Sequence, residues 1–436
     1  MNVRRTVTAI AATAVIAAAA APTATAAPVT TAPATTPEAP AAPEAPAAPE
    51  APAAPEVPGL HGSADPTYDG VWRQSLTLLA QDTTGVRPAA QAVDWLTAQQ
   101  CADGAFAAFR ADPAAKCGAK TPVDSNSTAA AVQALAALGG EDTAVRDAVR
   151  WLRSAQNPDG GWGYLPGGPS DTNSTSLVAG ALTAAGTAPD GVRSKKGKNA
   201  HDALLKLTVP CEADGGGAFA YQPDKKGALA ANADATAAGV LGGLDRTLAT
   251  KAAPATDPAT CAKPRTAADA ARNGAAHLVT ALAAKGHLVS SLAGAKDQPD
   301  HGNTADAVVA LAAAGLTDRA DRTVTWLKRD GAAWAAKSGP AAWSQLVLAA
   351  HATGADPRDF GGTDLVQRLN ATGPAPESVP DAKDTAAEDG KDTGDNAKDG
   401  KDDDGGPGVI WIVGVGLLVG VGIGILLSGR RKKRQK

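Results

Sequence analysis

The chain has 436 residues and a formal net charge of −4, with 41 basic against 45 acidic side chains. A balance this even excludes the strongly basic face typical of nucleic-acid-binding proteins, so we expect no nucleic-acid partner. The length is enough for one domain with a sizeable core, flanked by segments of other kinds.

Residues 1–27 are typical of a secretory signal peptide. The segment begins with Arg4 and Arg5, continues as the apolar run 7-VTAIAATAVIAAAAA-21 and ends in the small residues 24-ATAA-27. Such a segment is removed on export, so we expect the mature chain to lie outside the cytoplasm. The Ala-rich, Met-poor composition favours a bacterial source.

Segments of unusual composition flank the central part of the chain. Residues 28–65 are rich in Pro, Ala and Glu, which favours an extended polyproline II linker because Pro fixes φ and lacks an N–H donor. Residues 373–407 are rich in Asp, Lys, Gly and Pro and are predicted to be disordered. Residues 408–428 contain an uncharged apolar run long enough to span a bilayer, and the basic tail 429–436 should stay cytoplasmic. We therefore predict a single-pass protein of the cell membrane with an extracellular body.

An internal repeat occupies residues 66–372. The segment 94-DWLTAQQCADGAF-106 matches 150-RWLRSAQNPDGGW-162, and the segments that follow them, 124-DSNSTAAAVQALAALGG-140 and 171-DTNSTSLVAGALTAAGT-187, match as well. Each unit predicts a helix, a glycine-rich loop and a second helix that opens on Asp-x-Asn-Ser-Thr. Weaker copies follow at 203–244, 276–315 and 323–354, which makes five helix pairs.

A lone helix remains at each end of the repeats, at 71–81 and at 363–370. The first resembles the second helix of a unit and the last resembles the first helix, so the two could pair across the termini. A linear solenoid needs polar capping repeats, whereas complementary ends favour a closed array. We therefore predict an all-α fold, an α6/α6 toroid closed by the N- and C-terminal helices. The second helices should lie inside, around a central cavity, because segments such as 129-AAAVQALAAL-138 are apolar nearly all round.

The string Trp-Leu-x3-Gln-x3-Gly-x-Trp occurs twice, the first time with Phe as its last aromatic residue; its members are Trp95, Gln100, Gly104, Phe106, Trp151, Gln156, Gly160 and Trp162. It resembles the Gln-Trp repeat of the prenyltransferase and squalene-cyclase superfamily, whose members are α/α toroids. The residues themselves favour a structural role. The Gln can hydrogen-bond the turn that follows it, the Gly permits positive φ, and the last aromatic residue can cover the turn.

The resemblance leaves the function open, because the superfamily includes terpene cyclases, protein prenyltransferases, complement-type thioester domains and cobalamin carriers. Prenyltransferases need zinc held by Asp, Cys and His, and no Asp-x-Cys occurs in the chain, so we predict no metal site. The Gly-Cys-Gly-Glu-Gln type of sequence that thioester domains need does not occur either. Carbohydrate-active enzymes need paired carboxylates, and the sequence singles out no such pair.

Class II terpene cyclases carry Asp-x-Asp-Asp-Thr-Ala, in which the middle Asp donates a proton to an alkene. At what resembles the same register, Asn126 and Asn173 replace this acid and only Asp234 keeps it, in 232-NADATA-237. The inner helices are poor in the aromatic residues that stabilise carbocations, and no second α-barrel domain is found. A terpene-cyclase-type enzyme with Asp234 as proton donor is therefore the alternative interpretation.

Polar residues at the starts of the inner helices form the predicted binding site: Asp124, Asn126, Asp171, Asn173, Asn232, Asp234, His301 and Asn303. Such residues are ordinary N-caps, but several of them at one end of an apolar cavity are typical of a small-ligand site. The Asp-x-Asn-Ser-Thr-Ala form looks most like the cobalamin-carrier branch (intrinsic factor and transcobalamin) and its bacterial surface relatives.

The main prediction is accordingly a non-enzymatic toroid that binds a small hydrophobic or corrinoid ligand and could feed an uptake system. A membrane transporter, or a separate β domain like the one in the animal carriers, would be its partner. Binding of a surface macromolecule and a structural or adhesion role also stay open.

The four cysteines are expected to form two disulfides in an exported chain. Three pairings are possible, and we favour Cys101–Cys117 and Cys211–Cys261 because each joins neighbours in the sequence.

Overall fold

The structure, a computed structural model, describes residues 57–290 and 297–380. Within these residues the secondary structure is helical, with isolated β-bridges and no β-strand. The odd-numbered helices are mostly apolar: α1 (Gly70–Thr83), α3 (Ser125–Leu138), α5 (Thr172–Ala184), α7 (Ala233–Gly243), α9 (His301–Ala313) and α11 (Pro340–Thr353). The remaining helices alternate with them: α2 (Ala90–Ala98), α4 (Asp142–Ser154), α6 (Ala200–Leu205), α8 (Ala267–Ala283), α10 (Thr317–Ser338) and α12 (Leu365–Asn370).

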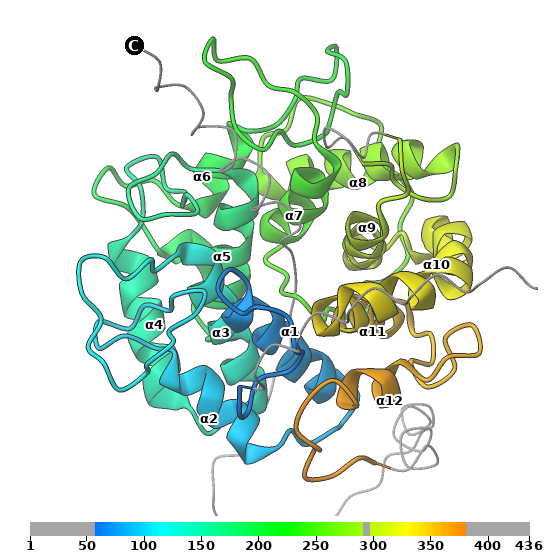
Figure 1. The fold of residues 1–436 in the computed structure, drawn as a ribbon. Coiled ribbons are helices and arrows are strands. Elements are labelled where there is room, and N and C mark those ends of the chain that lie inside the picture. Colours follow the sequence, from blue (N-terminus) through cyan, green and yellow to red (C-terminus); the bar gives the residue numbers. More distant parts are fainter. Residues whose placement is uncertain (1–56, 291–296, 381–436) are drawn as a thin grey trace, which may run out of the picture. The chain divides into compact units, whose positions relative to one another are not determined.

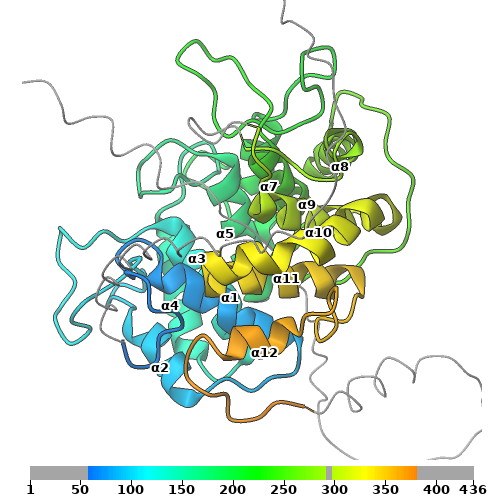
Figure 2. The ribbon, with the colours of Figure 1, turned by 45° about the vertical axis from the view of Figure 1, so that its right-hand side comes forward.

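The odd-numbered helices form a closed inner ring (Figure 1). Each packs against the next one in the chain, and α11 packs against α1. The even-numbered helices lie outside this ring, with α4 on α3, α8 on α7 and α10 on α9 and α11 (Figure 2). The body is therefore an all-α toroid of two concentric layers.

The difference between inner and outer sequences explains the two layers. In α3 every residue from Ser125 to Leu135 is buried, because neighbours contact this helix on all sides. In α4 only Ala148, Trp151 and Leu152 are buried, and charged residues occupy the opposite face. A helix apolar all round must lie inside, whereas an amphipathic one covers it.

The repeated glutamines tie each glycine-rich loop to the next outer element. The Nε2 of Gln100 donates to the carbonyl oxygens of Gly104, at 3.1 Å, and Ala144, at 2.8 Å. The Nε2 of Gln156 donates in the same way to the carbonyl of Gly160, at 2.9 Å, and to that of Val192, at 3.2 Å. Each glutamine therefore holds its own turn and anchors it to the following unit.

The other residues of the repeat complete the loop. Gly104 and Gly160 have φ angles of +98° and +97°, which side chains with a Cβ rarely adopt. Trp162 is fully buried, and its Nε1 donates to the carbonyl of Leu152 at 2.7 Å. Phe106 is also fully buried, while Trp95 and Trp151 are 8 % exposed. These contacts close the loop over the ends of the helices that it joins.

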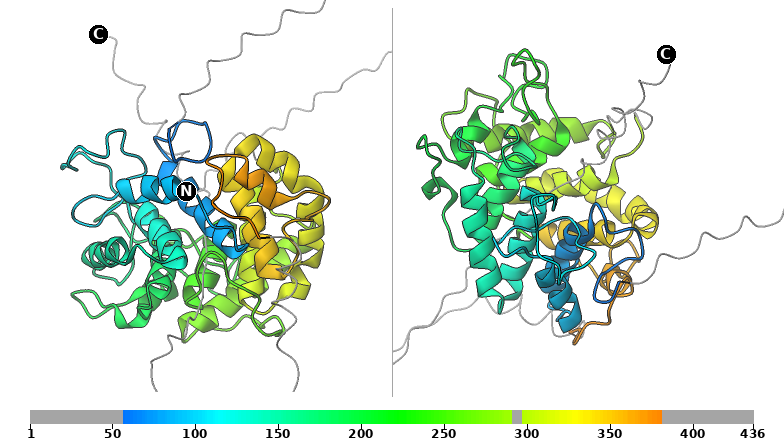
Figure 3. Two further views of the ribbon diagram at one scale, coloured as in Figure 1. Left: turned by 90° about the horizontal axis from the view of Figure 1, so that it is seen from below. Right: turned by 60° about the vertical axis from the view of Figure 1, so that its left-hand side comes forward.

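Contacts between the two ends of the body close the ring. The Gly62 N–H donates to the Thr372 carbonyl at 2.7 Å, and the Gln81 Nε2 donates to Asn370 Oδ1 at 2.9 Å. The Arg87 N–H donates to the Ser378 carbonyl at 2.9 Å. Figure 3 shows the first helices, in blue, beside the last helix, in orange. Segments on either side of residues 66–372 thus take part in these contacts.

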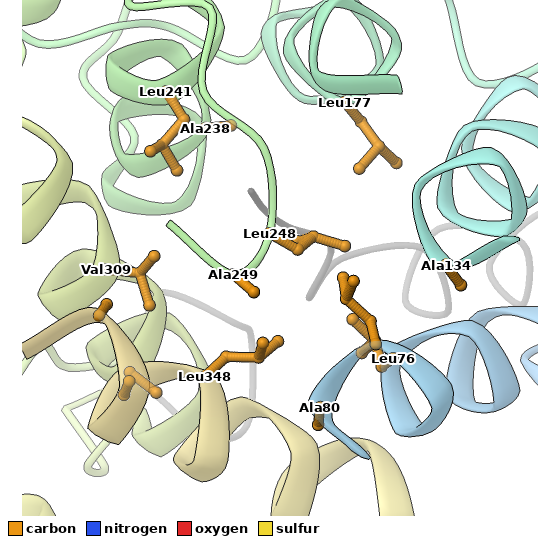
Figure 4. Close-up of a cluster of buried hydrophobic side chains, with 14 of the residues drawn as sticks. Leu76, Ala80, Ala134, Leu177, Ala238, Leu241, Leu248, Ala249, Val309 and Leu348 are labelled. Atoms are coloured by element: carbon orange, nitrogen blue, oxygen red, sulfur yellow. The ribbon is translucent and has the colours of Figure 1, made fainter. Parts of the chain in front are cut away.

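A segment that follows α7 fills the middle of the ring. Leu248 and Ala249, both 2 % exposed, lie among side chains from the surrounding inner helices (Figure 4). The Leu248 N–H donates to Gln133 Oε1 at 3.0 Å, and Gln133 Nε2 donates to the Leu177 carbonyl at 3.1 Å. The expected central cavity is thus occupied at this level, because small inner side chains leave a space whose filling buries apolar surface.

Both disulfides join loops, as Cys101–Cys117 and Cys211–Cys261, the pairing favoured from the sequence. In the part of the chain that the structure describes, no helix is long and apolar enough to cross a membrane. The predicted signal peptide 1–27, membrane span 408–428 and basic tail 429–436 lie outside the described residues, as do most of the two linkers.

Candidate functional site

The polar residues at the starts of four inner helices act as N-caps. Asp124 Oδ1 accepts the Ser127 N–H at 2.7 Å, and Asp171 Oδ1 accepts the Ser174 N–H at 2.7 Å. Asn232 and Asp300 accept the N–H of the residue three positions further on in the same way. These caps satisfy N–H groups that the helix itself cannot pair.

A threonine four residues after each cap fixes the preceding loop, and sequence reasoning missed this role. Its hydroxyl accepts the N–H of the residue that ends the loop, at 2.9 to 3.0 Å, in the pairs Thr128–Phe106, Thr175–Trp162, Thr236–Phe219 and Thr304–Leu288. The spacing Asp/Asn-x-x-x-Thr, present in all four units, was the available signal. The caps and threonines place the starts of these helices in equivalent positions on the ring.

Two amide–carboxyl pairs lie just inside these helix starts. Asn173 Nδ2, on α5, donates to Asp234 Oδ2, on α7, at 2.5 Å. Gln345 Nε2, on α11, donates to Asp306 Oδ2, on α9, at 3.0 Å. Asp234 is 3 % and Asp306 is 5 % exposed. Four successive inner helices thus contribute two buried acids flanked by two amides.

The sequence indicated only half of this arrangement. Asn173 and Asp234 were predicted site residues, and the structure brings them into direct contact. Asp306 and Gln345 were missed. The signal for Asp306 was an acid next to 307-AVVALAAAG-315, an apolar inner-helix segment in which a carboxyl is out of place.

Burial dominates the electrostatics of the acids. It raises the pKa of Asp234 to about 6, against the opposing hydrogen bond from Asn173, and Asp300 and Asp171 add to the rise. Burial also raises the pKa of Asp306 well above its ordinary value, and the Asp234 carboxylate raises it further. Asp124 and Asp171 have their pKa raised to about 6, again mainly by burial. Asp124, Asp171 and Asp234 therefore exchange protons closer to neutral pH than ordinary aspartates do, as general acids do.

The position of the Asp234 proton follows from its contacts. Oδ2 already accepts the amide of Asn173, and Oδ1 is buried without a hydrogen-bond partner. The amide favours Oδ2 as the carbonyl oxygen, so the neutral acid carries its proton on Oδ1. An acid O–H with no acceptor is poised to donate.

The remaining predicted residues differ in their surroundings. Asn126 Oδ1 is buried without a partner, and Asn303 Nδ2 donates to Asp300 Oδ2 at 2.8 Å. The His301 ring is tilted against Trp326, with centroids 4.6 Å apart, and stacks on Trp334, with centroids 5.5 Å apart. Its surroundings are therefore aromatic.

Loops supply two tyrosine rings in addition to Trp72 of α1 and Trp343 of α11. Burial raises the pKa of Tyr221 to about 12, and the nearby carboxylates of Asp171 and Asp234 contribute to the rise. Burial raises the pKa of Tyr164, and the nearby Asp124 carboxylate raises it further. Two tyrosine hydroxyls therefore lie near the buried acids, although the inner-helix sequences suggested an aromatic-poor interior.

A cavity of about 780 Å³ opens beside the start of α5. Its lining includes Pro169 and Ser170, which precede the Asp171 cap, together with the ammonium-bearing side chains of Lys196, Lys198 and Lys206. Lys198 pairs with Asp202 at 2.9 Å. The lining thus carries three lysine side chains, one of them paired, and the carboxylate of Asp159.

Comparison with known proteins finds one partial match in sequence. No protein-family model matches it. Over 85 residues it is 39 % identical to the drimenyl diphosphate synthase of Streptantibioticus cattleyicolor, a match that covers 20 % of this chain and 14 % of that enzyme. The chain therefore spans only a small part of the length of this relative.

Three solved structures are similar in outline. The first is a protein from Actinoplanes, with a TM-score of 0.40 and 18 % identity over 63 % of this chain and 76 % of that one. The second is the type II terpene cyclase MstE from Scytonema, with a TM-score of 0.41 and 16 % identity over 63 % of this chain and 73 % of that one. The third is the ent-copalyl diphosphate synthase from Streptomyces platensis, with a TM-score of 0.41 and 19 % identity over 65 % of this chain and 50 % of that one.

The predicted resemblance to the prenyltransferase and squalene-cyclase superfamily is confirmed by the match to drimenyl diphosphate synthase over 85 residues. The prediction of a non-enzymatic carrier for a hydrophobic or corrinoid ligand was wrong, because the relative matched in sequence is an enzyme. The Asp-x-Asn-Ser-Thr form that suggested the cobalamin carriers has a structural cause. The Asp of this pattern caps the helix and its Thr holds the preceding loop. These two roles explain the pattern without a corrinoid ligand.

Proposed function

We propose that the toroid catalyses an acid-initiated cyclisation of an isoprenoid, with Asp234 as the proton donor. The observation that supports this most directly is the state of Asp234, a buried acid held at Oδ2 by Asn173 and unpartnered at Oδ1. The match to a diphosphate synthase supports the choice of a terpene reaction over other acid-catalysed chemistry.

The reaction needs few protein groups. The O–H bond at Asp234 Oδ1 breaks and the proton joins one alkene carbon, whose π electrons form the new C–H bond and leave a carbocation on the other carbon. A second alkene closes the ring by attacking this cation, and loss of a proton from carbon ends the sequence. Asn173 holds the acid in place, and burial keeps water away from the cation. The half-buried ring of Tyr221, near Asp234, can stabilise positive charge.

The cationic cavity suggests the form of the substrate. Lys196, Lys198 and Lys206 surround a space next to the start of α5, the helix that supplies Asn173. Ammonium groups bind phosphate oxygens, so we propose a linear isoprenoid with a diphosphate at one end. Double replacement Lys196→Ala with Lys206→Ala should then raise KM for the diphosphate and leave the KM of the corresponding alcohol unchanged.

The test is to incubate the protein with linear isoprenoid diphosphates and alcohols of several lengths and to analyse the products by mass spectrometry. Cyclic products should form with the native protein and disappear with Asp234→Asn. The control Asp94→Asn removes an exposed carboxyl on α2 and should change nothing. Full activity of Asp234→Asn would remove Asp234 from the role of donor, and no conversion of any substrate by the native protein would refute the function.

We further propose that residues 408–428 hold this catalyst at the outer face of the cell membrane. The uncharged run and the basic residues after it support this placement. Protease added to intact cells should release a fragment that contains the toroid, whereas resistance of the toroid to protease until the cells are lysed would contradict the placement.

A further inference from the structure

Asp234 and the segment that fills the ring lie at different depths along the inner helices. Asp234 is the second residue of α7, and Ala238 and Leu241 follow it by four and seven residues on the same helix. These two side chains belong to the buried cluster that also contains Leu248 (Figure 4). An α-helix rises 1.5 Å per residue, so the cluster lies about 6–10 Å beyond Asp234 along α7.

Helix α5 places the segment at the same depth through direct contact. Gly180 follows Asn173, the partner of Asp234, by seven residues. A Cβ added at Gly180 would lie 3.2 Å from the carbonyl oxygen of Arg246 and 3.4 Å from the Cα of Thr247. The glycine therefore lets the backbone of the segment pass close to α5. On both α5 and α7 the segment thus lies one to two turns beyond the Asn173–Asp234 pair.

The segment is held on both sides of the ring. Its first part accepts no displacement without loss of the hydrogen bond to Gln133 of α3 described above. Its far part reaches the end of α9, where the Ala253 N–H donates to the Ala312 carbonyl at 2.9 Å. The Thr256 N–H donates to the carbonyl of Gly315, directly beyond that helix, also at 2.9 Å. The segment therefore crosses the ring between Asp234 and the end at which the inner helices finish.

We propose that Leu248 forms the floor of the substrate site and sets how far an isoprenoid chain extends beyond Asp234. This rests on the proposed function, in which the diphosphate binds at the lysine-lined cavity beside the start of α5. A chain that enters from that end passes Asp234 before its tip meets Leu248. A longer chain has to displace backbone that is hydrogen-bonded on both sides, and a shorter one leaves space above Leu248 and loses dispersion contacts. The site therefore selects one chain length.

The test measures binding by isothermal titration calorimetry, with Asp234→Asn present in every protein so that no substrate is consumed. Linear isoprenoid diphosphates that differ by one isoprene unit are compared. With Leu248 in place, the affinity should rise with chain length up to a limit and then fall. Leu248→Ala should move this limit to the next longer diphosphate and raise the affinity for that compound by about tenfold, because the floor becomes deeper. The control Val379→Ala, at a side chain that is 45 % exposed, should leave the series unchanged.

The same limit with and without Leu248 would overturn the proposal, whether or not the protein cyclises these compounds. A limit that moves, together with no cyclic product from the protein that retains Asp234, would refute the proposed function and leave the floor standing. Circular dichroism checks that each variant is folded. If Leu248→Ala does not fold, the smaller change Leu248→Val replaces it, and the affinity for the next longer diphosphate should then rise by less, but in the same direction.

The place of Leu248 is also tested without any isoprenoid. Leu248→Ala should leave an apolar space in the centre of the ring, and such spaces stay dry and bind benzene. Benzene should therefore raise the thermal midpoint of Leu248→Ala, and leave that of the native protein and of Val379→Ala unchanged. No rise for Leu248→Ala would overturn the floor. A rise, combined with no binding of any diphosphate, would refute the proposed function alone.

Discussion

Gly160→Ala tests why the loop of the repeat needs a glycine at this position. Gly160 has φ +97°, and a Cβ added there would lie 2.2 Å from the carbonyl oxygen of Asn199, the N-cap of α6. A Cβ added at the equivalent Gly104 would lie equally close, 2.2 Å, to the carbonyl oxygen of Asp147. The glycine therefore serves both an unusual backbone angle and a close approach between the loop and the next outer helix.

The two effects can be separated because Gly167 offers a matched control. Gly167 has φ +75° and nothing within 4 Å of an added Cβ, so Gly167→Ala bears only the conformational cost, about 1–2 kcal/mol. At Gly160 the obstacle is backbone, which cannot rotate away. Overpacking of this kind adds about 1–3 kcal/mol, so Gly160→Ala should cost about 2–5 kcal/mol in total.

The assay is urea denaturation of both variants with the disulfides intact, followed by circular dichroism. Gly160→Ala should lower the free energy of unfolding by clearly more than Gly167→Ala. Equal losses for the two variants would mean that the close approach to Asn199 does not contribute, and the structural account of the repeat would then fail.

Three further changes probe the acid pair, the filled centre and a disulfide. The folded state raises the pKa of Asp234 from 3.8 to about 6, so the folded protein binds this proton more tightly than the unfolded chain does. The stability that this tighter binding provides is fully present below pH 3.8 and is lost as the pH rises through 6. Asp234→Asn should therefore stabilise the protein at pH 7 by about 3 kcal/mol and not at all below pH 3.8, as urea denaturation at the two pH values will show. Leu248→Ala should lower the free energy of unfolding by about 2–5 kcal/mol in the same assay, because the Leu248 side chain is only 2 % exposed. The control Leu165→Ala should lower it by almost nothing, because Leu165 is already 51 % exposed in the native protein. Equal losses would contradict the placement of Leu248 in the ring. Replacing both Cys211 and Cys261, which are 50 residues apart, by Ala should lower stability by about 4 kcal/mol, and an unchanged thermal midpoint would count against the bond.

The expected gain in stability for Asp234→Asn bears on function as well. A side chain whose replacement by its isostere stabilises the protein is retained for a reason other than folding. Asn has nearly the same shape as Asp and can still accept the amide of Asn173, so the comparison isolates the charge. Loss of activity together with a gain of stability in one variant would be strong support for catalysis by Asp234.

The ring could be predicted because its cause lies in sequence patterns that repeat. Apolar helices opening on a capping residue alternate with amphipathic ones, and the half-units at the two ends match. The start of α8 was harder, since the Ala-rich stretch that begins at Ala267 resembles a loop, and only the capping box of Thr266 and Asp269 marks it. Composition alone does not separate a helix from a linker when most of its residues are alanine.

The pairing of acids and amides could not be predicted, because it depends on distances across the ring. Asp306 and Gln345 are 39 residues apart, and Asn173 and Asp234 are 61 apart. Only the packing of neighbouring inner helices brings them together. The segment around Leu248 has no periodic pattern, and its place in the centre depends on the hydrogen bond to Gln133.

The hydrogen bond between Gly62 and Thr372 makes the two ends of the toroid neighbours, so the ring has no free edge. A short peptide could join these ends, and the chain could be reopened at the exposed 164–167 loop without cutting an inner helix. The cyclic order of the helices would then specify the fold, whichever unit comes first. The segment after α7 is the exception to this tolerance. A new break at 245–256 would release the residues that fill the centre of the ring and leave a central cavity.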